Sequence, residues 1–162
     1  MEENKAISIK AILIGWVVDV FGTMIILLGI GIFMGIVVGI IGASAGQSAS
    51  EIRQKVSDIE KYPPFIIFEN IIGTLFTILG GFVTAYIAKH AELKNALIMG
   101  ILSLVSGLFC ITSQYLLSAY SSTNSIVYPL ITAILTIPAA LAGAYIRILL
   151  KDNRPPTLIP PP

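Results

Sequence analysis

The chain has 162 residues, of which 56% are hydrophobic and 12% are charged, with a formal net charge of +1. A soluble domain carries about 25% charged residues, so this composition excludes an ordinary water-soluble domain. The small net charge gives no electrostatic basis for nucleic-acid binding. The apolar residues stand in long runs that suit helices crossing a core about 30 Å thick, without the alternation of transmembrane strands. We therefore predict an all-α integral membrane protein.

The first predicted span covers about residues 11–38. The apolar run continues to Ala43 and is broken only by Asp19. About 20 residues suffice to cross a bilayer, and no polar turn divides this run into two crossings. We therefore expect a single long helix that is tilted or projects from the membrane.

An external loop, residues 44–64, follows the first span. Ser48 and Glu51 have the spacing of a capping box, which begins a helix. Apolar residues then recur at helical spacing among charged ones, at Ile52, Val56 and Ile59. The pattern predicts a short amphipathic helix that lies on the membrane surface or on the other helices. Pro63 should end this loop and start the next span, because proline suits a first helical turn.

Three further spans are predicted at about residues 65–88, 95–117 and 126–150. Together with the first they make a four-transmembrane-helix bundle in a single membrane domain, residues 1–162. The tail, residues 151–162, is rich in proline, and residues 154–162 should form an extended polyproline II segment.

Lysine and arginine residues predict the orientation of the bundle. Seven of them fall on the side of the two termini and three on the side of the external loop. Because basic residues stay on the cytoplasmic side, this multi-pass protein should have both termini in the cytoplasm.

The two halves of the predicted bundle resemble each other. Residues 11–15 (AILIG) parallel residues 96–100 (ALIMG), and Ala85-Tyr86-Ile87 parallels Ala144-Tyr145-Ile146. Apolar helices can look alike by chance, but the constant offset at several positions favours duplication. Each half is then a helical hairpin entering from the same side, a parallel repeat about an axis along the membrane normal.

Small residues recur every four positions along three of the spans. Such ridges let another helix approach closely within a membrane. The helix-packing positions that we predict are Gly31, Gly35, Gly39, Gly73, Thr77, Gly81, Ala85, Ala140 and Ala144.

Asp19, Ser103 and Glu69 form the candidate intramembrane polar site. Burying an ionisable group in a bilayer costs at least ~2.5 kcal/mol, so such groups are functional candidates. Counting from the start of each span puts Asp19 and Ser103 about 12 Å deep, and Glu69 about 6 Å from the opposite boundary. The Asp19 carboxyl could hydrogen-bond a facing helix or, where water reaches it, bind and release a proton.

A shallower position for Asp19 is the alternative. Residues 20–41 are long enough to span the bilayer without it. The helix would then place Asp19 and Trp16 at the cytoplasmic interface, where tryptophan is favoured.

The sequence offers no catalytic or metal-binding pattern. Cys110 is the single cysteine and His90 the single histidine, so neither a disulfide nor a metal cluster is expected. We expect a packed thiol at Cys110, because it lies within an apolar run. The prediction is a non-enzymatic protein without a cofactor.

Two stretches resemble small four-span bacterial inner-membrane proteins of uncharacterised function. They are residues 10–19 (KAILIGWVVD) and residues 80–89 (GGFVTAYIAK), the latter leading to residues 95–100. The resemblance implies a bacterial cytoplasmic (inner) membrane.

The glycine ridges, the surface helix and the proline tail favour an accessory or scaffold subunit. Its partners would be the lipid bilayer and either further copies of the chain, as a homo-oligomer, or a larger membrane complex. The alternative is a small oligomeric transporter or channel subunit with Asp19 as an intramembrane protonatable site.

Overall fold

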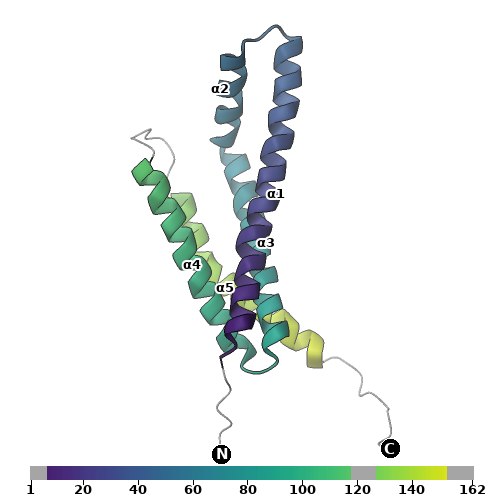
Figure 1. The fold of residues 1–162 in the computed structure, drawn as a ribbon, viewed down its shortest axis with the longest axis vertical. Coiled ribbons are helices and arrows are strands. Elements are labelled where there is room, and N and C mark those ends of the chain that lie inside the picture. Colours follow the sequence, from purple (N-terminus) through teal and green to yellow (C-terminus); the bar gives the residue numbers. More distant parts are fainter. Residues whose placement is uncertain (1–6, 118–126, 153–162) are drawn as a thin grey trace, which may run out of the picture.

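Five α-helices make up the computed structural model, which describes residues 7–117 and 127–152. They are α1 (Ile9–Ser44), α2 (Ala49–Glu60), α3 (Pro63–Ala88), α4 (Glu92–Leu117) and α5 (Val127–Asp152). The start of α1, the turn between α3 and α4 and the end of α5 lie at one end of the bundle (Figure 1), here called the closed end. Helix α3 contacts all four of the others, whereas α1 does not contact α5 in the described ranges.

Four helices are long and apolar enough to cross a membrane. They are α1, α3, residues 92–110 of α4 and residues 130–152 of α5, which confirms an all-helical bundle with four candidate spans. Helix α4 begins at Glu92, three residues before the expected start, because an acidic side chain suits the first turn of a helix. The expected proline-rich tail beyond Asp152, the loop 118–125 and the start of the last span at residue 126 lie outside the described residues.

Helix α1 is one uninterrupted helix of 36 residues. At about 1.5 Å per residue it is about 54 Å long, against about 39 Å for the 26 residues of α3. Its first turn is capped by Ser8, whose Oγ accepts a hydrogen bond from the Ala11 amide at 3.3 Å. The outer third of α1 therefore extends beyond the level at which α3 begins.

Helix α2 has the predicted capping box at its start. The Ser48 amide donates to Glu51 Oε2 at 2.7 Å, and the Glu51 amide donates to Ser48 Oγ at 3.4 Å. The bond from the Ser48 amide, joined by one from the Ser48 hydroxyl at 2.8 Å, lowers the pKa of the exposed Glu51 carboxyl. The short helix predicted from the spacing is confirmed. As predicted, Pro63 occupies the first turn of α3.

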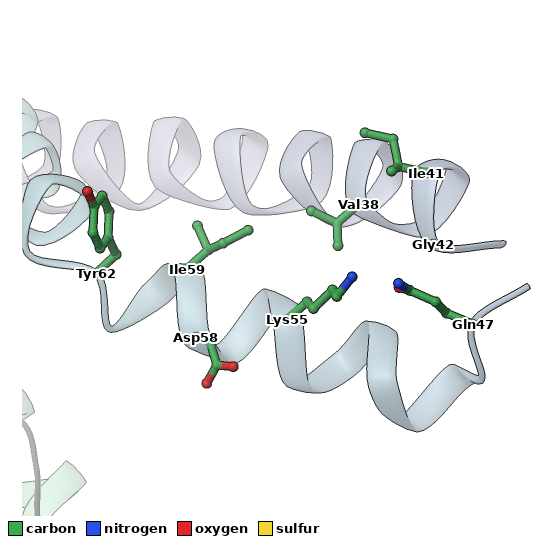
Figure 2. A pocket seen from close by; sticks show the side chains of 8 residues that line it. All are labelled: Val38, Ile41, Gly42, Gln47, Lys55, Asp58, Ile59 and Tyr62. Carbon is green, nitrogen blue, oxygen red and sulfur yellow. The ribbon is translucent and has the colours of Figure 1, made fainter. Parts of the chain in front are cut away.

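The apolar side of α2 packs on the outer third of α1. Ile52 contacts α1 at Gly42, where an added Cβ would lie 2.6 Å from its side chain. Between the two helices lies a groove of about 450 Å³. Figure 2 shows Val38 and Ile59 extending into it and the ends of Lys55 and Gln47 facing one another. The sequence predicts that this helix lies on the membrane surface or on the other helices, and in the structure it packs on α1.

The helices approach most closely near the closed end. A Cβ added at Gly81 would overlap the backbone oxygen of Ala140, and one at Gly143 would overlap the backbone oxygen of Ile78. Ala85 and Ala144 meet in one buried cluster with Ala96. Small residues thus allow α3 and α5 to cross in backbone contact.

Away from the closed end, α4 and α5 diverge from α1 (Figure 1), while α5 stays beside α3. Gly31, Gly35 and Gly39 have nothing within 4 Å of an added Cβ. The Cys110 thiol is exposed on α4. The expectation of a packed thiol is wrong, because the Cys110 side chain lies on an exposed side of α4.

Candidate functional site

A buried hydrogen bond joins Asp19 of α1 to Thr77 of α3. The Thr77 hydroxyl lies 2.9 Å from Asp19 Oδ1, and the two residues are 6% and 7% exposed. The hydroxyl of Ser103, on α4, is the other polar neighbour of this carboxyl, and Ser103 is 8% exposed. We call these three residues the Asp19 cluster.

The cluster lies near the middle of the bundle. Thr77 is about 16 Å from the Ala88 end of α3 and about 21 Å from its Pro63 end. Ser103 is likewise about 16 Å from the start of α4 at Glu92. Asp19 therefore lies well inside the bundle, and its depth in a membrane stays a prediction.

The surroundings of the cluster are tightly packed. A Cβ added at Gly80 would lie 3.1 Å from the Asp19 Cβ and 2.7 Å from the Gly15 backbone oxygen, and it would overlap Met99. A Cβ added at Gly15 would likewise overlap the Thr84 hydroxyl. The two glycines let α1 and α3 approach closely enough for the Asp19–Thr77 hydrogen bond to form.

The two hydroxyl groups of the cluster differ in their bonding. Thr77 Oγ1 lies 2.9 Å from Asp19 Oδ1 and 3.1 Å from the Gly73 backbone oxygen, yet a hydroxyl carries only one hydrogen. The buried Ser103 Oγ makes no hydrogen bond within the described residues. The cluster therefore has more acceptors than donors when Asp19 is ionised.

Glu69, the third predicted site residue, is not part of the cluster. It lies on α3 about 12 Å from Thr77, towards the start of the helix, and is partly buried. The structure thus brings Asp19 and Ser103 together and leaves Glu69 apart from them. The four-residue spacing of small residues predicts only a helix-packing role for Thr77, and the structure adds its hydrogen bond to Asp19.

Asn95 is a fully buried polar residue that the sequence analysis missed. Its Oδ1 accepts a hydrogen bond from the Ser8 amide at 2.8 Å, and its Nδ2 donates to the backbone oxygens of Ala91 and His90 at 3.0 and 3.2 Å. One side chain thus connects the start of α1 to the turn between α3 and α4. The sequence feature that could have identified Asn95 is its position, because it is a polar residue at the start of an apolar run.

Charged side chains pair at the closed end. Lys151 of α5 donates to Glu92 of α4 at 3.1 Å, and Glu92 is only 8% exposed. The Arg147 guanidinium lies 5.0 Å from the centre of the Tyr86 ring, within cation–π range. These pairs join α5 to α4 and α3.

A second groove, of about 460 Å³, lies between α3 and α5 in the diverging half. Its lining is mostly apolar, and the Thr132 hydroxyl donates to Asn70 Oδ1 within it. Asn70 Nδ2 also donates to the Ile66 backbone oxygen at 2.7 Å. Both side chains are therefore engaged in bonds of the bundle itself.

Within residues 7–117 and 127–152 no three His, Cys, Asp or Glu side chains gather closely enough to hold a metal ion. Comparisons of the chain with protein-family models, curated proteins and solved structures give no significant match. The functional conclusion therefore depends on the geometry of the chain itself.

Proposed function

We propose that the chain is a four-span protein of the bacterial inner membrane with both termini in the cytoplasm. Four helices of sufficient length and hydropathy support this proposal. Five of the seven basic residues assigned to the cytoplasm lie in described segments at the closed end, namely Lys10, Lys89, Lys94, Arg147 and Lys151. Basic residues remain on the cytoplasmic side of a membrane.

The two hairpins, α1 with α3 and α4 with α5, are in this proposal a parallel repeat. The offset that matches Ala85 to Ala144 also matches Gly81 to Ala140. Residues related by a two-fold axis meet each other where the axis passes between two helices. The contact of Gly81 with Ala140, and the cluster that holds Ala85 and Ala144, support such an axis between α3 and α5.

The function that we propose is that of a non-enzymatic accessory or scaffold subunit, which packs with its own copies or with other membrane proteins. The outer third of α1 carries this proposal. Ile36, Ile40 and Ile41 are exposed in the part of α1 that extends beyond the start of α3, and Gly35 beside them has nothing within 4 Å of an added Cβ. An exposed apolar surface of this kind is typical of an interaction site.

The test compares two glycines that have open space around them. Gly35→Leu places a bulky side chain on the outer third of α1, whereas Gly107→Leu places one on α4, and neither added Cβ has a neighbour within 4 Å. Both variants should fold. Native mass spectrometry in mild detergent should show that Gly35→Leu dissociates an assembly that the wild type and Gly107→Leu retain. Identical assemblies in all three proteins would refute the proposed docking surface.

The Asp19 cluster favours a second candidate, a subunit of an oligomeric transporter or channel. A buried carboxyl between three helices is a common feature of ion and proton pathways. Proton flux into vesicles that hold the wild-type protein, and its loss in Asp19→Asn, would favour transport over the accessory role.

A further inference from the structure

We infer that Asp19, Thr77 and Ser103 form a proton-binding site, in which the two hydroxyl groups change hydrogen-bond partners as the carboxyl gains or loses a proton. The inference goes beyond the accessory role, since proton binding requires neither transport nor a partner. Three residues on three different helices supply its groups. No lysine or arginine side chain of these three helices lies at the site.

The charged groups around the cluster are all distant from it along their helices. In the described ranges Asp19 forms no salt bridge. On α3, Glu69 is about 12 Å from Thr77, and on α4, Lys94 and Glu92 are about 14 and 16 Å from Ser103. On α1 itself Lys10 is about 14 Å away. Helix α2 packs about 30 Å along α1 from Asp19, and its charged residues are Glu51, Arg53, Lys55, Asp58 and Glu60.

The hydrogen-bond donors and acceptors of the Asp19 cluster suit both the ionised and the protonated carboxyl of Asp19. An ionised Asp19 only accepts, so Thr77 donates to Oδ1, as its 2.9 Å distance allows, and Ser103 has a hydrogen free for the other oxygen. A proton bound to the carboxyl turns it into a donor to Thr77 Oγ1. The Thr77 hydrogen then goes to the Gly73 backbone oxygen at 3.1 Å.

The same geometry favours a proton over a metal ion. The cluster offers one carboxylate and two hydroxyls, whereas hard cations such as Mg²⁺ and Ca²⁺ take about six or more oxygen ligands. Gly80 packs directly beside Asp19, and Met99 in turn packs against Gly80. Binding a proton adds one hydrogen from water to a carboxylate oxygen and removes one negative charge from an apolar environment.

The test is infrared spectroscopy of the full chain in lipid nanodiscs at stepped pH. Because the chain has nine Asp and Glu residues, the spectrum of Asp19→Asn is subtracted from that of the wild type at each pH. The difference should contain a protonated-carboxyl stretching band at low pH that is replaced reversibly by carboxylate bands at high pH and shifts in D2O. Glu69→Gln is the matched control and should keep the band. A difference spectrum without such a band, or with a band that is unaffected by pH, would overturn the inference.

Variants of the hydroxyl partners test the exchange of hydrogen bonds. Thr77→Val keeps the shape of the side chain but removes its hydroxyl, so the frequency of the band should change, and Thr77→Ser should restore it. Ser103→Ala should alter the carboxylate bands by removing a donor to the ionised form. Unchanged spectra in both Thr77→Val and Ser103→Ala would show that the hydroxyls do not take part. These two variants also provide the test should Asp19→Asn fail to fold.

Discussion

Gly81 and Ala140 bring α3 and α5 into direct backbone contact, so closely that a single Cβ on Gly81 would overlap the Ala140 backbone oxygen. A lipid bilayer gives no hydrophobic drive for helices to associate, so such close packing is a main source of their affinity. The contact lies near the closed end, where the four long helices converge (Figure 1).

Gly81→Ala should therefore destabilise the fold. Overpacking costs about 1–3 kcal/mol, and here the obstructing atom is backbone, which cannot rotate away. Unfolding in increasing SDS, followed by circular dichroism, measures the loss. Gly107→Ala is the matched control, since its Cβ meets open space and alanine favours the helix. Equal stability of the two variants would mean that α3 and α5 do not cross at Gly81.

Substitutions of Asp19 should separate its hydrogen bond from its burial. Asp19→Leu should cost about 0.6 kcal/mol, the average for hydrogen bonds between membrane helices. Asp19→Lys should assemble poorly, because a lysine in the middle of the bundle cannot extend its amine to water. Unfolding in SDS measures the first effect, and the yield of folded protein in mild detergent measures the second. Wild-type yield from Asp19→Lys would place this residue at the membrane interface instead.

The capping box of α2 should depend on pH. Hydrogen bonds from Ser48 lower the pKa of Glu51, so the stabilisation is fully present above the pKa of an ordinary glutamate. It is lost as the pH falls through the lowered pKa of the folded state. The protection of the Ser48 amide against hydrogen exchange, measured relative to an unstructured peptide at the same pH, should therefore decrease in acid. Glu51→Gln, which can still accept the bond, should make this exchange insensitive to carboxyl protonation.

Asn95→Ala should detach the start of α1 from the turn between α3 and α4. The buried Asn95 accepts from the Ser8 amide and donates to two backbone oxygens, and unsatisfied buried groups cost about 1–3 kcal/mol. Hydrogen exchange should increase in the first turn of α1 and leave α2 unaffected. Exchange that is unchanged at Ser8 would contradict this role.

Topology reporters test the proposed orientation. Reporters placed after Lys151 and at His90 should register as cytoplasmic, and those at Gln54 and Ser122 as external, with Ser122 outside the described residues. An external signal at Lys151 would reverse the orientation. Disagreement between the Lys151 and His90 reporters would contradict the count of four spans.

The amino-acid sequence by itself determined the helices and the capping box of α2. Long apolar runs specify helices of spanning length, and Ser48 and Glu51 interact within one turn, so neither depends on distant parts of the chain. The tertiary structure decided which of the small residues form close contacts between helices. Gly35 and Gly81 stand in similar four-residue ridges, yet one faces open space and the other the backbone of α5.

The partners of the polar residues were also decided by the tertiary structure. The counted depths placed Asp19 level with Ser103, but they could not choose Thr77 as the hydrogen-bond partner of Asp19, nor reveal that Asn95 binds the Ser8 amide. Depth along a helix follows from about 1.5 Å per residue, a local property. The direction that a side chain faces depends on how neighbouring helices rotate and cross, which is set by contacts between residues distant in the sequence.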